Sequence, residues 1–150
     1  MPRGWKFEGM RELESSIKRL GKVPQSAVTK AARQGMNIAL KAAREKAPVD
    51  TGDLKGGIII KAERKTVTGK KVYDVMMDPK KNPLFVKMSA DGQKRYYYPA
   101  SQEYGFMNVD GGYTPGYRFL RNALTENAEA IEQKIVGVMG KEIDKALAKR

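Results

Sequence analysis

Apolar residues follow a helical period at both ends of this chain and a strand-like pattern in its middle, and this change of period constrains the fold most. At spacings of three and four, they form one stripe within residues 8–20, a second within 24–46 and a third within 117–149. Between residues 57 and 98, β-branched and aromatic runs alternate with turn-forming residues, which is typical of short strands. The sequence therefore predicts an α+β fold.

Glycine and proline residues set the expected limits of these elements. Gly21 and Pro24 separate the two N-terminal helices, and Pro48 stops the second one, because the residue before a proline avoids the helical region. Residues 106–116 hold too many turn formers to bury a core, so we expect a mobile loop there. We predict a single domain over residues 1–150. It has two N-terminal helices, a small antiparallel sheet of about four strands, and a long C-terminal helix packed on one face of that sheet.

The composition removes several kinds of chemistry. The chain has no cysteine and no histidine, which excludes disulfides, thiolate zinc sites, cysteine nucleophiles and the commonest general base. The branched aliphatic run at residues 58–60 is far shorter than the roughly 20 apolar residues of a membrane helix. Residues 1–8 lack the apolar core of a secretory signal. We expect no catalytic residue, cofactor, metal or membrane contact, and synthesis in the cytoplasm.

The net charge is +12, from 29 basic and 17 acidic residues, and a field of this sign attracts polyanions. Composition alone does not place these charges, so a basic soluble surface and a surface that faces nucleic acid both stay open. Basic residues cluster on the hairpin predicted within residues 58–77: Lys61, Arg64, Lys65, Lys70 and Lys71. They could lie along a phosphate backbone, or they could be a solvated face that protects the edge of the hairpin.

A tripeptide after the second helix matches the aspartic proteases. Asp50, Thr51 and Gly52 repeat their Asp-Thr-Gly sequence, in which two aspartates from a dimer or pseudo-dimer share a proton. Here the tripeptide follows a helix ended by Pro48, and Asp53 adds charge beside it. We favour a structural turn in which Asp50 caps the short helix that follows. The residues of this turn are Pro48, Asp50, Thr51, Gly52 and Leu54.

Three stretches of the sequence together carry a family resemblance. Residues 47–55 read Ala-Pro-Val-Asp-Thr-Gly-Asp-Leu-Lys, residues 98–105 read Tyr-Pro-Ala-Ser-Gln-Glu-Tyr-Gly, and residues 117–124 read Tyr-Arg-Phe-Leu-Arg-Asn-Ala-Leu. In this order they resemble the neck or tail-completion family of long-tailed bacteriophages, also called the minor tail component family. Its pattern is Ala-Pro-x-Asp-Thr-Gly-x-Leu, then x-Glu-x-Gly after a tyrosine, then Pro-Phe-Leu-Arg-x-Ala-Leu. The chain departs from it at Arg118, where proline is usual, and at Gly57, where serine is common.

The resemblance implies a structural virion protein that forms a ring joining the DNA-filled head to the tail, without catalysis. The implied partners are other copies of the chain, about six if the ring follows the symmetry of the tail. The other implied partners are head-closure or connector proteins and tail-terminator or tail-tube proteins. Genomic DNA in the lumen of the ring would face the basic hairpin. The implied location is the neck or tail of the virion, and the host cytoplasm during assembly. Interface residues would be Tyr98, Glu103, Tyr104, Gly105, Phe119 and Leu120.

Two other functions stay open at this point. The first is a free basic DNA-binding protein of the cytoplasm, which the net charge favours. The second and more remote one is an aspartic protease built around Asp50.

Overall fold

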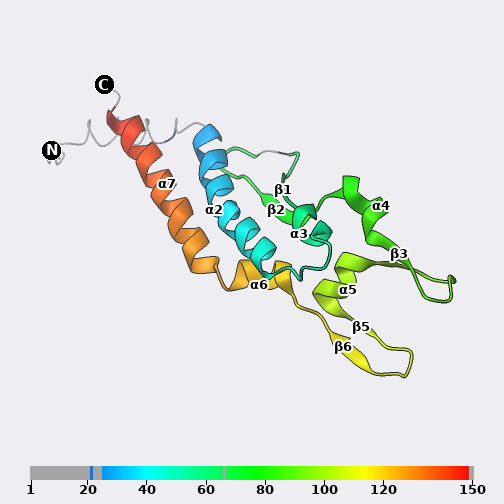
Figure 1. Cartoon of the computed structure of the whole chain (residues 1–150). Coiled ribbons are helices and arrows are strands. Elements are labelled where there is room, and N and C mark those ends of the chain that lie inside the picture. The colour runs from blue at the N-terminus through cyan, green and yellow to red at the C-terminus, as the bar shows by residue number, and fades with distance from the viewer. Residues whose placement is uncertain (1–20, 22–24, 66, 149–150) are drawn as a thin grey trace, which may run out of the picture.

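The computed structural model describes residue 21 and residues 25–65 and 67–148 (Figure 1). The helix predicted within residues 8–20 lies outside the described residues. Helices and short antiparallel strands make up the rest, so the predicted α+β class is confirmed. Within the described ranges, no helix has the length and apolar character needed to cross a membrane.

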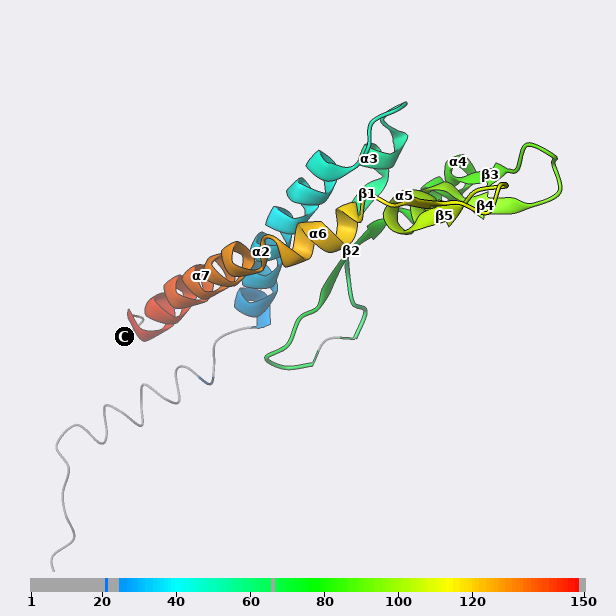
Figure 2. The same cartoon turned by 90° about the horizontal axis from the view of Figure 1, so that it is seen from below.

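Two long helices form one end of the molecule. α2 (Gln25–Lys46) and α7 (Ala128–Ala148) lie side by side in both views and run in opposite directions (Figures 1 and 2). The buried face of α2 consists of small residues at every fourth position: Ala27, Ala31, Gly35, Ala39 and Ala43. A Cβ atom on Gly35 would stand 2.6 Å from Cγ1 of Ile135, so α7 approaches α2 closely at this point. This contact explains a glycine that costs the isolated helix about 1 kcal/mol relative to alanine.

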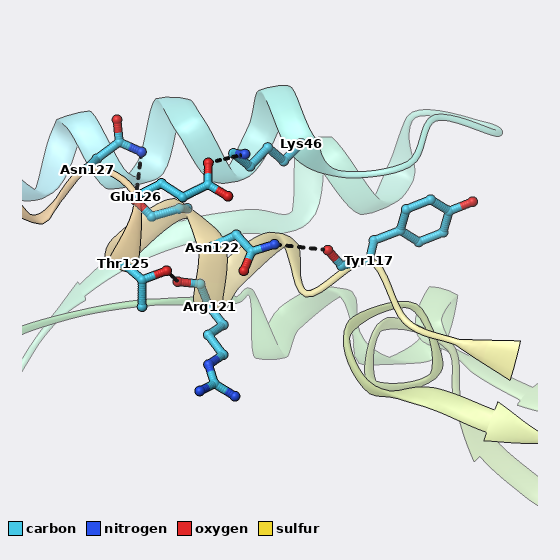
Figure 3. Close-up of polar contacts among 8 residues, drawn as sticks. Lys46, Tyr117, Arg121, Asn122, Thr125, Glu126 and Asn127 are labelled. Atoms are coloured by element: carbon cyan, nitrogen blue, oxygen red, sulfur yellow. Dashed lines mark hydrogen bonds and ion pairs between the residues drawn. The ribbon is translucent and has the colours of Figure 1, made fainter. Parts of the chain in front are cut away.

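The single helix predicted over residues 117–149 is interrupted, which corrects that prediction. α6 (Phe119–Thr125) ends before α7 begins. The hydroxyl of Thr125 and the amide of Asn127 each donate a hydrogen bond to the carbonyl four residues earlier, at 3.2 and 3.0 Å (Figure 3). Side chains that bind these carbonyls compete with the helical ladder and bend helices, which is the physical reason for the break.

The predicted antiparallel hairpin is confirmed. α3 (Asp53–Gly57) leads directly into β1 (Ile58–Ala62), which pairs with β2 (Tyr73–Met77). The register places Ile58 opposite Met77, and both side chains are buried where α2 packs against the hairpin. The core is centred here and contains Ala43, Ala47, Leu54, Ile58, Met77, Phe85, Phe119 and Ala123.

In the described part of the chain the strands form three separate antiparallel pairs and not one sheet of four, so this part of the prediction is wrong. Beyond β1 and β2, β3 (Val86–Met88) pairs with β4 (Arg95–Tyr97). β5 (Gly105–Met107) pairs with β6 (Tyr113–Pro115). The loop predicted over residues 106–116 is therefore largely a hairpin.

Prolines separate these strand pairs. Each of Pro79, Pro83 and Pro99 stands in the first turn of a short helical element: η1 (Pro79–Lys81), α4 (Asn82–Phe85) and α5 (Tyr98–Tyr104). Proline suits a first helical turn because its φ is fixed and its missing N–H is not needed there, but it cannot donate to a strand ladder. β2 therefore does not continue toward β3, and Tyr98, expected in the fourth strand, begins α5 instead.

Two hairpins project from the body of the molecule. We call residues 86–97, which contain β3 and β4, the first arm, and residues 105–115, which contain β5 and β6, the second arm. Both arms lie at the end of the molecule opposite the first turn of α2 and the last turn of α7 (Figures 1 and 2). The fold thus separates a helical body from two strand-built projections.

Candidate functional site

A buried carboxylate holds the second arm to the helical body. Glu103 lies in the last turn of α5 with 5% of its surface exposed. One of its carboxylate oxygens accepts a hydrogen bond from the backbone N–H of Leu120 at 2.8 Å, and the other accepts one from Arg121 at 3.1 Å. These N–H groups belong to the first turn of α6, where the helix itself offers no acceptor. Glu103 therefore caps α6 from α5, and this cap fixes α5 and α6 relative to each other.

The backbone around Glu103 is too closely packed to accept side chains. Gly105 follows α5 with φ 90° and ψ −176°, a conformation that is in practice restricted to glycine. A Cβ atom on Gly116 would lie 2.5 Å from the amide nitrogen of Gly105. The N–H of Arg118, which has φ 51°, donates to the carbonyl of Glu103 at 3.0 Å. The second arm therefore leaves and re-enters the body through one narrow junction.

Side chains also tie both ends of α6 to their surroundings (Figure 3). Near its start, the amide of Asn122 donates to the carbonyl of Tyr117 at 3.5 Å. Just past its end, Glu126 forms an ion pair with Lys46 of α2. The side chains of this ion pair are 53% and 38% exposed, and such pairs contribute at most about 1 kcal/mol. The buried cap by Glu103 is therefore the stronger constraint on α6.

Both arms expose large apolar side chains. The first arm exposes Met88 and Tyr96, and the second arm exposes Phe106, Met107, Val109 and Tyr113. Val109 is fully exposed, so its side chain stands clear of the rest of the chain. Apolar side chains gathered on projecting hairpins are typical of surfaces that contact other proteins. The arms are therefore the candidate interaction site of this molecule.

The residues expected at subunit interfaces lie mostly inside the chain. Glu103 and Phe119 are buried, and Tyr98, Gly105 and Leu120 are half-buried. Tyr104 is exposed, at 70%.

The sequence interpretation missed the apolar residues of the second arm because it took residues 106–116 for a loop. A signal for them exists. Asp110-Gly111 stands between the short runs Phe106-Met107 and Tyr113-Thr114, which contain strand-forming residues, and this pattern predicts a hairpin.

The turn after α2 positions α3, but Asp50 does not cap it, which corrects that prediction. α3 begins at Asp53, and its N-cap is Gly52, which has φ 85° and no side chain to offer. The helix thus begins too late for Asp50 to be its cap. The hydroxyl of Thr51 donates to the carboxylate of Asp53 at 2.7 Å. Leu54 points into the core.

A small cavity of about 100 Å³ lies beside this turn, between residues 48–54, α4, Lys87 and Tyr98. Burial raises the pKa of the Tyr98 hydroxyl above its ordinary value, and the negative charge of Asp50 raises it further. Asp50 itself is exposed on the loop that follows a helix, and this is not the strand-lined setting of an aspartic protease. Within the described ranges, no group of three or more acidic side chains is placed to hold a metal ion.

The predicted basic residues do lie together on the β1–β2 hairpin and its loop. Lys71 is half-buried and donates to the carbonyl of Glu63 at 3.1 Å, whereas the other four are exposed. Gln25 holds this loop against the start of α2, because its amide donates to the carbonyl of Lys70 at 3.0 Å and accepts from the N–H of Gly69 at 2.8 Å. Lys61 lies in β1, and the other four lie on the attached loop between β1 and β2.

Comparison with known proteins identifies the family of this chain. The profile of the family described as "Bacteriophage HK97-gp10, putative tail-component" matches residues 11–93, more than half of the chain. The chain belongs to this family. The matched region contains the motif at residues 47–55 and ends before the motifs at 98–105 and 117–124. No curated protein and no solved structure matched the chain.

Membership in the HK97-gp10-like family confirms the resemblance at the level of the family. This tail component is a structural protein of the virion, and it functions in contact with other virion proteins.

Proposed function

We propose that this tail component forms a closed ring at the head–tail connection of a long-tailed phage, where it completes the tail and joins it to the DNA-filled head. The observation that carries the proposal is the pair of apolar arms on a member of a tail-component family. In this proposal residues 1–150 act as one neck domain. A ring subunit needs two different surfaces for its two neighbours, and a chain with a helical body and two projecting arms can offer them.

The arms support the proposal energetically. A two-stranded hairpin is marginal on its own in water, and these hairpins expose apolar side chains instead of burying them. Removing apolar surface from water contributes roughly 25 cal/mol per Å², so docking on a neighbour would stabilise the arms. The proposed neighbours are further copies of the chain, about six by analogy with tail symmetry. Head-closure or connector proteins would lie on one side, and tail-terminator or tail-tube proteins on the other.

Phage that lack this protein are expected to accumulate DNA-filled heads and separate tails, with loss of infectivity. Without the ring, the two halves of the virion have no shared contact surface. Electron microscopy and gradient sedimentation of lysates measure the ratio of joined to separate particles. The wild-type chain supplied from a plasmid should restore joining. Joined, infectious particles that do not contain the chain would contradict the proposed function.

We also propose that the basic hairpin faces genomic DNA in the lumen of the ring. Lys65 and Lys70 are exposed on its loop, and each phosphate that a lysine neutralises releases counterions. A variant with Lys65→Glu and Lys70→Glu is expected to assemble but to lose packaged DNA on storage. The matched control, Lys134→Glu with Lys141→Glu, makes the same change of charge at exposed positions of α7. Nuclease-protected DNA per particle is the measurement, and equal retention in both variants would refute the DNA-facing role.

The exposed basic loop is also what a free DNA-binding protein would need, so that function remains the alternative. It predicts tight binding of naked duplex by the isolated chain, with a steep dependence on salt, and absence of the chain from particles. The ring predicts weak nonspecific binding and presence in every particle. Affinity for duplex at two salt concentrations, together with protein analysis of purified virions, separates the two.

A further inference from the structure

An open groove of about 720 Å³ lies where α4 meets the first arm. Its lining consists of Asn82, Pro83, Val86, Met88 and Arg95. Three of these residues are apolar, and Met88 is 52% exposed. Arg95 is exposed and forms no ion pair with any carboxylate of the described part of the chain. The groove therefore suits an apolar side chain that has a negative charge next to it.

The tip of the second arm has this combination in a fixed shape. The N–H of Asn108 donates to the carbonyl of Gly112 at 2.6 Å, and the carboxylate of Asp110 accepts from the N–H of Gly112 at 3.2 Å. The hydroxyl of Thr114 donates to the side-chain oxygen of Asn108 at 3.1 Å. These bonds hold the turn so that Val109 is fully exposed beside Asp110. The tip is thus an apolar knob with an adjacent carboxylate on a hydrogen-bonded turn.

We propose that the second-arm tip of one copy docks into the first-arm groove of the next copy, with Val109 on the apolar lining and Asp110 facing Arg95. This inference rests on the proposed function, because it names the contact that would close the ring. The complementary features are an apolar knob with a negative charge and an apolar groove with an unpaired positive charge. Both arms extend from the same end of the molecule (Figure 2), and their tips diverge in Figure 1, so one tip can meet a neighbour that the other does not. Such a head-to-tail contact generates a closed ring when its rotation closes.

The chain contains no cysteine, so engineered disulfides report this contact without background. Virions or tails assembled from the Val109→Cys, Met88→Cys double variant are expected to give a ladder at multiples of 16.7 kDa on non-reducing gels, which reduction collapses to one band. The matched control pairs Val109→Cys with Val136→Cys, which lies on α7 and is 62% exposed. It should give the single band only, because both cysteines are accessible but not apposed.

The possible outcomes distinguish a failure of the docking contact from a failure of the proposed ring. Particles that contain the double variant but give no ladder, or a control ladder of equal strength, overturn the docking and leave the ring intact. Particles without the chain would instead refute the proposed function.

A charge exchange tests the same contact independently of disulfide chemistry. Asp110→Arg should lower the yield of joined particles at least tenfold, because it places two positive charges at the groove. Adding Arg95→Asp should restore most of that yield. Both residues are exposed, so the free subunit is expected to fold in every variant, which circular dichroism checks. A double variant that joins no better than the single one overturns the pairing.

Discussion

Replacing Gly105 with alanine is expected to lower the free energy of unfolding by about 3–5 kcal/mol. At φ 90° and ψ −176° an alanine is strained, and its Cβ atom would also collide with the backbone carbonyl oxygen of Thr114. Backbone atoms on the opposing strand cannot move aside as a flexible side chain can. Urea unfolding of the purified chain, followed by circular dichroism, measures the change.

Gly137→Ala is the matched control for this substitution. Gly137 lies in α7, and apart from its own stretch of helix backbone no atom stands within 4 Å of the position that a Cβ would take. Alanine there should stabilise the chain by up to about 1 kcal/mol, because glycine is the poorer helix former. If Gly105→Ala unfolds at the same urea concentration as the wild type, the junction is not as closely packed as described.

Replacing Glu103 with alanine is expected to cost about 2–4 kcal/mol of stability. The substitution removes the acceptor for the N–H groups of Leu120 and Arg121 and leaves both donors without their partner near a buried position. Glu103→Gln should cost less than alanine, because the amide keeps one acceptor oxygen while its NH₂ group faces the second N–H. Thermal and urea unfolding of the two variants measure this order.

Glu132→Ala provides the control for loss of a carboxylate, since Glu132 is exposed on α7. Its effect should stay within about 0.5 kcal/mol. A loss of stability in Glu103→Ala no larger than that of the control would show that the cap contributes nothing. The two Glu103 variants also test the link to assembly, because this carboxylate holds the second arm to the body. At temperatures where they remain folded, they should still form fewer joined particles than Glu132→Ala.

Local patterns in the sequence were sufficient for part of the candidate site. The β1–β2 hairpin that carries the predicted basic residues was recognised, because a hairpin joins strands that are close in sequence. The apolar arms were not recognised, since runs of three residues such as Gly105–Met107 show little periodicity and the Asp110-Gly111 turn signal was not weighed against the loop. Glu103 was expected at an interface because it stands in one of the motifs that carry the family resemblance. Its burial depends on α6, which no local pattern brings to it.

The sequence by itself determined the α+β class, the extent of α2 and the β1–β2 hairpin, because period, proline and turn chemistry act over a few residues. The separation of the strand pairs and the break before α7 also have local causes, in the prolines and in Thr125 and Asn127. Only the tertiary structure decided the cap that Glu103 places on α6, because it depends on which distant backbone groups need a partner once the core has formed. That requirement is set by packing in three dimensions and has no counterpart in local sequence.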